Sequence, residues 1–375
     1  MKVNMVASSA GSVNAAAFRA ISKLLSTCGL GAIASRHGIL DKTSISVLSK
    51  LVYNVFQPCL LFVNVMSTVA RSGGDSAITI LPLAAAFQVF VGFFVGKIVS
   101  YFMYGKEATN DSKLLLTCTT FGNSGPLPFV FADALLRMHP DPTLAPKAVA
   151  YISLYLLGWS PLFWVIGTTI LSKDNGGSRH DKMKALMGRV LSPPVIASLS
   201  GLAVGFTPFI REPFLSNTGI LNPAFEAMRT LGNAYLPAVL LVLAGSLVPP
   251  PPSPTDKPVP VATKTKGFRA AFFKQAAAVY ISRFLLMPSL AFFLIKTAKA
   301  KVPALAGILS NPMLVFILLL ESCMPSAQNS TVILSLNGDG VGASKMARML
   351  VAVYIAGIPA MSFWLAKVMK YTALF

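Results

Sequence analysis

The stretch LPLAAAFQVFVGFFVGKIV, at residues 81–99, decides the fold class of this chain. Its apolar residues follow one another almost without interruption, and only Gln88 and Lys97 are polar. In an α-helix, about 20 such residues cross the hydrocarbon core of a bilayer. A strand of a membrane barrel would instead alternate apolar and polar residues. The stretch therefore predicts a transmembrane helix.

The composition of all 375 residues agrees with this interpretation. Hydrophobic residues make up 54% of the chain, charged residues only 12%, and the mean hydropathy is +0.66. Soluble domains carry about 25% charged residues. In hydrocarbon every backbone amide must be paired within the protein, so continuous apolar runs fold as a helix bundle. We expect an all-α polytopic membrane protein that has the lipid bilayer as its surroundings.

Ten apolar runs are candidate membrane spans. They cover residues 15–34, 44–70, 77–103, 113–138, 147–171, 190–210, 222–248, 270–297, 307–335 and 345–371. The first run is weak, and a cleaved signal peptide is the alternative for it. A span is preferred because the repeat described below needs one. Residues 1–14 form a small, polar N-terminal tail.

The loops divide the chain and indicate its orientation. A basic loop at 172–189 separates a five-span half at 15–171 from a second half at 190–371, which contains a proline-rich loop at 249–267. The side of the membrane that holds both loops receives 18 of the 32 basic residues, against 13 on the other side. The positive-inside rule places both loops in the cytosol and both termini on the far side. We interpret these charges as topology determinants and lipid contacts, and expect no nucleic acid as a partner, despite the net charge of +19.

Metal, redox and catalytic chemistry find no support in the sequence. The four cysteines lie in apolar runs without a C-x-x-C pair, and the three histidines lie in predicted loops. No metal spacing is present, so we expect neither a metal nor a cofactor. An intramembrane enzyme would need a nucleophile and a base at depth, and the spans contain no histidine and no paired aspartates. A channel would need a ring of filter residues, which is also not visible.

Two motifs recur at the same ordinal position of each half. They are Asn54-x-x-x-Pro58 and Asn233-x-x-x-Pro237 in spans two and seven, and Tyr155-x-x-Gly158 and Tyr354-x-x-Gly357 in spans five and ten. Because each half has five spans, the second half must enter the membrane in the opposite orientation. Two inverted repeats are the architecture of many secondary transporters.

Spans four and nine are interrupted near their centres. The interruptions read Gly122-Asn123-Ser124-Gly125-Pro126-Leu127-Pro128 and Pro325-Ser326-Ala327-Gln328-Asn329. Broken helices at this depth expose backbone N–H groups with partial positive charge, which suits a carboxylate. The side chains of Asn123, Ser124, Gln328 and Asn329 add neutral donors. The bland alternative is an ordinary proline kink, but two breaks at corresponding positions favour a binding site.

Other polar residues within the spans carry open alternatives. Glu321 and Arg283 form either a structural ion pair or a coupling site, because an ionisable group at this depth is functional by default. Asn54 and Gln57 in span two either line the cavity or cap the bend at Pro58. Tyr155 either stacks on a ligand ring or belongs to the core.

With these motifs in place, the chain resembles the auxin efflux carrier family over residues 15–371, through the two interruptions and the Asn54…Pro58 span. Its short central loop is more similar to PIN-LIKES proteins than to PIN-FORMED carriers. The resemblance implies ten helices in two inverted five-helix repeats, and fourth and ninth helices that cross at prolines. The crossing would lie at Pro126 or Pro128 and at Pro325, with Asn123 and Asn329 as carboxylate donors.

The resemblance also implies indole-3-acetic acid as substrate and the endoplasmic reticulum membrane as location, with the plasma membrane as the alternative. The leading hypothesis is therefore a carrier of small organic anions that works by an elevator-type movement. The alternative is a proton- or cation-coupled symporter of other carboxylates, with Glu321 as the proton-binding group. A homodimer is left open as an assembly.

Overall fold

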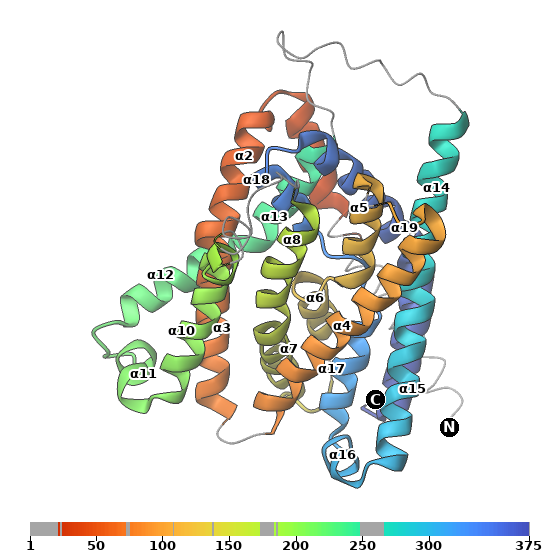
Figure 1. The fold of residues 1–375 in the computed structure, drawn as a ribbon. Coiled ribbons are helices and arrows are strands. Elements are labelled where there is room, and N and C mark those ends of the chain that lie inside the picture. The colour runs from red at the N-terminus through yellow and green to blue at the C-terminus, as the bar shows by residue number, and fades with distance from the viewer. Residues whose placement is uncertain are drawn as a thin grey trace.

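A computed structural model of the chain describes residues 22, 25–72, 76–107, 109–136, 139–172, 184, 187–247 and 266–374. The described residues fold as helices (Figure 1), and the one β-type pairing among them is an isolated bridge. Six helical segments are long and apolar enough to cross a membrane, or seven if one sharply bent pair counts as a span. The prediction of an all-α membrane protein is confirmed, and the number ten stays a prediction.

The helices follow the predicted spans in order. In the first half they are α2 (Lys42–Leu51), η1 (Val52–Phe56), α3 (Gln57–Ser72), α4 (Ala77–Tyr104), α5 (Asn110–Thr120), α6 (Pro126–Leu136), α7 (Leu144–Leu162), η2 (Phe163–Gly167) and α8 (Thr168–Leu171). In the second half they are α10 (Pro193–Phe206), α11 (Pro208–Leu215), α12 (Asn222–Asn233), α13 (Tyr235–Leu247), α14 (Lys266–Ile281), η3 (Ser282–Leu286), α15 (Met287–Lys301), α16 (Pro303–Ile308), α17 (Pro312–Ser322), α18 (Asn329–Leu336) and α19 (Gly340–Thr372). The three η elements are single turns of π-helix within longer helices.

Some predicted segments lie outside the described residues. These are the tail at 1–14 and most of the loops at 172–189 and 249–267. The first predicted span is described in part, and its residues 25–34 lie in a helix that continues to residue 36.

Span six differs from its prediction. The helix α10 ends at Phe206, before the predicted end at residue 210, and α11 leaves it at an angle of 103°. Pro208 is the cause, because proline disfavours helical backbone in the residue before it, and Thr207 is extended with φ −105° and ψ 97°. The short α11 therefore turns sideways from α10 at the edge of the molecule (Figure 1).

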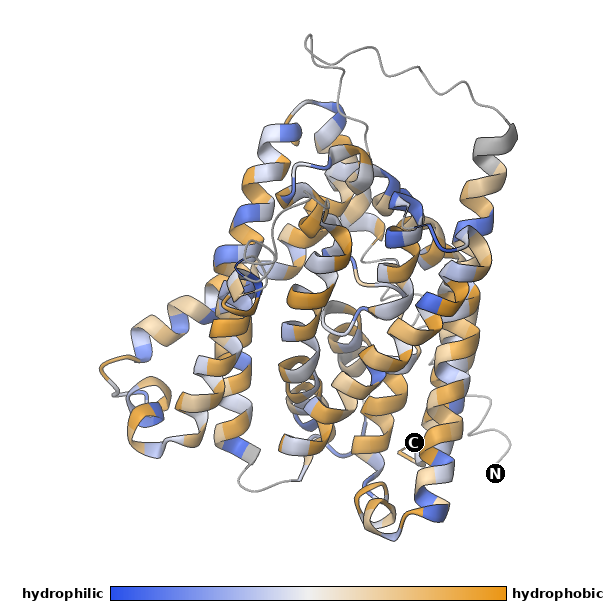
Figure 2. Ribbon diagram, viewed as in Figure 1, coloured by the Kyte–Doolittle hydropathy of each residue, from blue (hydrophilic) through white to orange (hydrophobic). Residues whose placement is uncertain are grey.

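We divide the helices into two groups, which also contact each other, through α3 and α7 and through α13 and α19. A framework group contains α2, α3, α10, α12 and α13, in which α10 and α12 pack along α3 and α13 packs on α2. A crossing group contains α4–α8, α14, α15 and α17–α19, in which α4 packs on α5 and α7, and α19 packs on α14, α17 and α18. Figure 2 shows orange, hydrophobic residues along the middle of the long helices and blue ones near many of their ends. The crossing group contains both interrupted helices.

Candidate functional site

The interruption of span four lies between α5 and α6. The first half-helix ends at Thr120, and Phe121 has extended backbone with φ −109° and ψ 112°. The second half-helix starts at Pro126, and Pro128 lies in its first turn. Proline is tolerated there because the first N–H groups of a helix have no partner within it. The break itself is therefore residues 121–125, and the prolines begin the next helix.

The interruption of span nine lies between α17 and α18. It runs from Cys323, after the last residue of α17, to Gln328, before Asn329 begins α18. Pro325 stands in the middle of this break.

The two breaks pair with each other through their backbones. Gly122 and Ser326 form an antiparallel bridge, in which Asn123 N–H donates to the Pro325 carbonyl at 2.7 Å and Ala327 N–H donates to the Phe121 carbonyl at 2.9 Å. Unwound backbone inside a membrane needs such partners. The broken helices therefore meet at their interruptions.

Tyr354 on α19 joins both breaks through its hydroxyl. It donates to the Ser326 carbonyl at 2.7 Å and accepts from Asn123 Nδ2 at 3.0 Å. The same Nδ2 lies 3.3 Å from Oε1 of Gln328. The amides of the two breaks are thus held side by side in the interior.

Arg283, in the π-helical turn η3, binds the other side of the crossing. Its Nε and Nη2 donate to the Met324 carbonyl at 3.1 and 2.7 Å, and Nη1 donates to the Thr119 carbonyl at 3.3 Å. These carbonyls belong to the last turn of α5 and to the break that follows α17. A cation is favourable there, because the C-terminal end of a helix carries partial negative charge.

The guanidinium needs a glycine beside it. A β-carbon on Gly122 would lie 2.1 Å from Nη2 of Arg283, which no real contact allows. Gly125 in the same break has space, since a β-carbon there would meet only methyl groups of Leu156 at 3.9 Å. The two glycines of the motif thus have different roles.

A cavity of about 300 Å³ lies between the framework group and the crossing group. The framework group lines it with residues of α3, α12 and α13: Gln57, Leu60, Leu61, Gly232, Asn233, Tyr235 and Leu236. The crossing group lines it with both breaks, α6 and α7: Asn123, Ser124, Gly125, Phe129, Val130, Leu156, Trp159, Ala327, Gln328 and Asn329. Its walls contain apolar and aromatic groups, several amides, and no charged side chain among the described residues.

The N-terminal ends of two half-helices face this cavity. Ser124 and Gly125 precede α6, while Gln328 and Asn329 stand at the start of α18, and all four line the cavity. Helix N-termini carry partial positive charge and free N–H groups. The positive ends therefore face the cavity, whereas Arg283 binds at the negative ends of the partner half-helices.

One side-chain donor in the cavity wall is unused. Gln328 is 1% exposed, and among the described residues its Nε2 has no hydrogen-bond partner. Leaving a buried donor unpaired costs about 1–3 kcal/mol. An acceptor in the cavity would satisfy it.

Asn329 connects the two groups. The hydroxyl of Tyr235, on α13, lies 2.9 Å from Oδ1 and 2.6 Å from Nδ2 of Asn329. This hydrogen bond lies in the cavity wall and links the framework group to the crossing group.

Several predicted residues lie elsewhere. Asn54 is exposed, and its side chain donates to the Lys50 carbonyl at 2.8 Å, so it does not line the cavity, and Gln57 does. Tyr155 is buried in α7, outside the cavity wall. Pro325 and Ser326 contribute carbonyls to the crossing, and the Ser326 hydroxyl donates to the Cys118 carbonyl at 2.7 Å.

The ion pair between Glu321 and Arg283, one of the two alternatives for these residues, does not form. The Arg283 guanidinium donates its N–H groups to the backbone carbonyls of Met324 and Thr119. These carbonyls lie at the negative ends of two helices, where a cation is most favoured. The Glu321 carboxyl is fully buried, and neither of its oxygens has a well-formed hydrogen bond within the described residues.

A second cavity, of about 500 Å³, adjoins the first at Asn233. Helices α3, α7 and α12 line it, and they supply three cationic side chains: Arg71, Lys147 and Arg229. Arg229 pairs with Glu226 at 2.8 Å, which leaves two cations without a carboxylate partner among the described residues. We call this space the basic vestibule.

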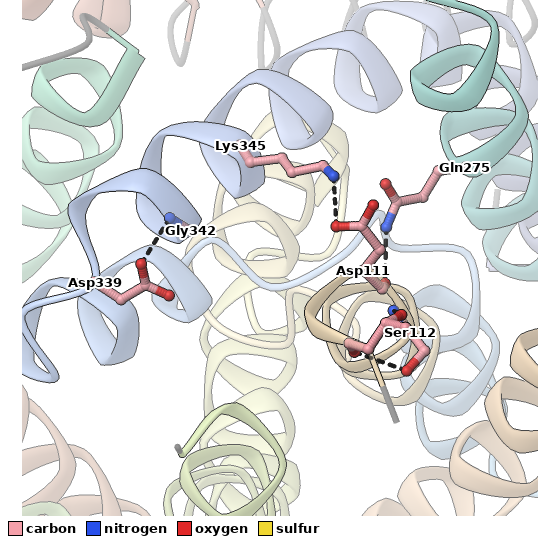
Figure 3. Close-up of polar contacts among 7 residues, drawn as sticks. Asp111, Ser112, Gln275, Asp339, Gly342 and Lys345 are labelled. Carbon is pink, nitrogen blue, oxygen red and sulfur yellow. Dashed lines mark hydrogen bonds and ion pairs between the residues drawn. The ribbon is translucent and has the colours of Figure 1, made fainter. Parts of the chain in front are cut away.

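The opposite end of the crossing group is tied by an ion pair. Figure 3 shows Lys345 of α19 directed at the carboxylate of Asp111 in the first turn of α5, at 2.5 Å. Gln275 of α14 donates to the Asp111 carbonyl at 2.9 Å. At the start of α17, Asn311 donates to the Tyr151 hydroxyl of α7 at 3.1 Å. The outer ends of both interrupted helices are therefore anchored to a neighbouring helix of the same group.

Sequence reasoning missed Tyr235 and Tyr354 as parts of the site. Both lie in motifs that were noticed: Tyr235 within Asn233…Pro237, and Tyr354 at the start of the Tyr-x-x-Gly motif. The repetition of these motifs could have indicated that both tyrosines belong to the site, but it was used only to predict the inverted topology of the two halves. In the described residues no three His, Cys, Asp or Glu side chains gather as metal ligands.

Comparison with known proteins identifies the family. The family model described as membrane transport protein matches residues 16–365. The chain is 22% identical over 368 residues to Protein PIN-LIKES 1 of Arabidopsis thaliana, covering 85% of this chain and 72% of that protein. It is 19% identical to Protein PIN-LIKES 3 of the same plant, covering 84% and 87%. The uncharacterized transporter YBR287W of Saccharomyces cerevisiae is 22% identical over 283 residues, covering 56% and 65%. The chain is a multi-pass membrane protein that belongs to the membrane transport protein family, also known as the auxin efflux carrier family.

Proposed function

We propose that this protein is a secondary carrier of small organic anions, which binds the carboxylate of its substrate where the two interrupted helices meet. The observation that carries the proposal is the cavity wall. Two half-helix N-termini and the free Nε2 of Gln328 face one space without an opposing cation or anion. A carboxylate accepts hydrogen bonds only, so it matches these donors.

None of the described residues that line the cavity is basic, and this favours transport over tight storage of an anion. A lysine or arginine in a dry cavity would hold an anion strongly. Neutral amides and helix ends bind it more weakly, so the anion can leave again. Trp159 and Phe129 line the cavity and supply aromatic surface for the organic part of the substrate. A volume of about 300 Å³ lies at the lower end of the range of small-molecule sites, about 300–1,000 Å³.

An elevator-type movement is the mechanism we propose. Both breaks, and hence most donors, belong to the crossing group, while the framework group supplies the facing wall. Sliding of the crossing group along the framework would carry the site across the membrane. The basic vestibule would collect anions at one entrance, because its cations raise the local anion concentration.

Ten spans in two inverted five-helix repeats, at 15–171 and 190–371, remain part of the proposal. Equivalent contacts in the two halves support it. A β-carbon on Gly158 would meet Pro82 of α4, and one on Gly357 would meet Phe284 of η3, so both repeated glycines pack against the third span of their own half. The anchors of α5 on α19 and of α17 on α7 are likewise exchanged between the halves.

Indole-3-acetic acid is the substrate we propose to test first, and the endoplasmic reticulum membrane is the proposed location. Both come from the resemblance to the auxin efflux carrier family. An aromatic ring bearing a carboxylate also suits a cavity that combines Trp159 with amide donors.

The test is uptake of radiolabelled indole-3-acetic acid by proteoliposomes at a set membrane potential. We expect saturable uptake that falls at least tenfold in Asn123→Ala and Gln328→Ala. Asn54→Ala is the matched control, because this asparagine is exposed and bonds only to its own helix. Wild-type uptake in both cavity variants would refute the site. Uptake of other carboxylates but not of indole-3-acetic acid would retain the site and replace the substrate.

A proton-coupled symporter is the second candidate, and the buried Glu321 carboxyl supports it. The two candidates differ in what drives transport. An uncoupled carrier responds to potential and keeps this response in Glu321→Gln. A symporter accumulates substrate in response to a pH gradient alone, and Glu321→Gln abolishes that accumulation.

A further inference from the structure

A groove of about 100 Å³ lies on the outside of the crossing group, where α4, α15 and α17 meet. Its lining is apolar except for Gln88, and the main contributors are Phe87, Met287, Leu290, Leu294, Ile295 and Leu318. Phe87 is 54% exposed and Leu294 36% exposed, so the groove opens outward. In a membrane protein that surface faces lipid.

Lysines stand at one end of the groove. Residues i and i+4 share a helix face, so Lys299 lies one turn beyond Ile295, and Lys301 lies two turns beyond Leu294. Both lysines are in the last turn of α15, are exposed, and have no carboxylate partner among the described residues. Figure 2 shows this end of α15 in blue below a mostly orange helix.

The end of α19 adds to this positive charge. The ring of Phe292 on α15 packs against the rings of Trp364 and Tyr371 on α19, with ring centroids 5.4 and 5.6 Å apart. This packing brings the two helix ends together. Lys367 lies over the Trp364 ring at 4.8 Å, and Lys296 lies over the Tyr371 ring at 5.9 Å. With Lys370 this makes five lysines, which we call the lysine collar: Lys296, Lys299, Lys301, Lys367 and Lys370.

The groove and the collar have the spacing of one lipid molecule. An α-helix rises about 1.5 Å per residue, so the lining from Met287 to Ile295 extends about 12 Å, and Lys299 and Lys301 lie about 6–9 Å farther along the axis. An acyl chain occupies an apolar groove, and its phosphate then lies at the level of the lysines. Lysine side chains extend toward the headgroup region from such positions.

We propose that the groove and the lysine collar bind one anionic phospholipid, whose acyl chain lies between α4, α15 and α17 and whose headgroup contacts Lys299 and Lys301. Charge selects the lipid class, because five lysines that have no carboxylate partner in the part of the chain that the structure describes favour an anionic headgroup over a zwitterionic one. The lipid bridges α15 to α4 and α17, and thus braces one of the interrupted helices from outside.

Native mass spectrometry of the full chain tests this, after exchange into mixed micelles of phosphatidylglycerol and phosphatidylcholine. We expect retention of one phosphatidylglycerol, with at least fivefold preference over phosphatidylcholine. Lys299→Ala/Lys301→Ala should lose the preference. Lys42→Ala/Lys50→Ala, two exposed lysines of α2, should keep it. Ala291→Phe should fill the groove and reduce retention of both lipids.

Two results would overturn the proposal. One is equal retention of the two lipids by the wild-type protein, or an unchanged preference in the α15 variant. The other is displacement of phosphatidylglycerol by millimolar inorganic phosphate, which would assign the collar to a free anion. Melting temperatures of all variants, measured in the same detergent, verify that each one is folded.

Discussion

The hydroxyl of Tyr354 donates to the Ser326 carbonyl at 2.7 Å and accepts from the Asn123 amide at 3.0 Å, so one side chain of α19 joins two breaks that are about 200 residues apart in the chain. Together with the backbone pairing of Gly122 and Ser326, it fixes the donors of the proposed site before any substrate arrives. Donors that are already oriented bind an anion without paying for reorganisation.

Gly122→Ala should destabilise the protein strongly. Its new methyl group would lie 2.1 Å from Arg283 Nη2 and force the guanidinium away from the carbonyls. Overpacking of this kind costs about 1–3 kcal/mol, and the displaced bonds add to it. Melting in detergent should show a clear drop. Gly125→Ala is the control, because its methyl group fits at 3.9 Å from Leu156. Equal melting temperatures for the two variants would contradict the geometry.

Arg283→Lys should not restore the wild-type protein. A lysine keeps the charge but has no planar fork, so it cannot bind the Met324 and Thr119 carbonyls together. We expect a loss of about 1–3 kcal/mol of stability and lower transport. Arg348→Lys, at a residue that bonds within its own helix, should be nearly neutral. The prediction fails if Arg283→Lys transports and melts like the wild-type protein.

Tyr235→Phe should affect substrate binding more than stability. Asn329 would lose the hydroxyl that orients its amide, so we expect the KM for the transported anion to rise several-fold. The loss of stability should stay near 1 kcal/mol, the usual contribution of one hydrogen bond. In Tyr280→Phe the deleted hydroxyl has no partner among the described residues, so this variant should retain the KM. An unchanged KM in Tyr235→Phe would show that the bond does not orient Asn329.

Neutralising the basic vestibule should slow anion uptake in a salt-dependent way. In Arg71→Gln/Lys147→Gln, uptake at low substrate concentration should fall several-fold at low ionic strength. The difference from the wild-type protein should shrink at 1 M salt, where charges are screened within about 3 Å. Lys106→Gln/Lys274→Gln removes two exposed lysines outside the vestibule and should have no such effect. A loss of uptake that is independent of salt would argue against electrostatic attraction.

The interruptions could be predicted from the sequence, because glycine and proline change the backbone conformation at their own position and at the residues next to them. Two glycines and two prolines within seven residues cannot form a regular helix interior, whatever surrounds them. The contacts across the crossing were not readable in the same way. Arg283 and Glu321 look like ion-pair partners in sequence, but tertiary packing places the guanidinium against the carbonyls of two helix ends.

Asn54 illustrates a different difficulty. It lies in a repeated motif and was, together with Gln57, a candidate for the cavity wall, yet of the two only Gln57 lies there. The helix contains a π-helical turn at Val52–Phe56, which widens the turn by one residue and rotates the faces that follow. A helical period of 3.6 residues cannot anticipate such a shift.

Most of the polar groups that hold the crossing together bind main-chain carbonyls, and the Asn123 amide, which donates to the Tyr354 hydroxyl, is the exception. Arg283 binds those of Met324 and Thr119, Tyr354 binds that of Ser326, and the breaks bind each other backbone to backbone. The architecture therefore places few demands on the amides that face the cavity. A related chain could exchange Gln328 or Asn329 for other side chains and still assemble the same crossing. In the carrier proposed above, cargo preference and the integrity of the crossing are thus separable, so the cargo can diverge in evolution while the crossing persists.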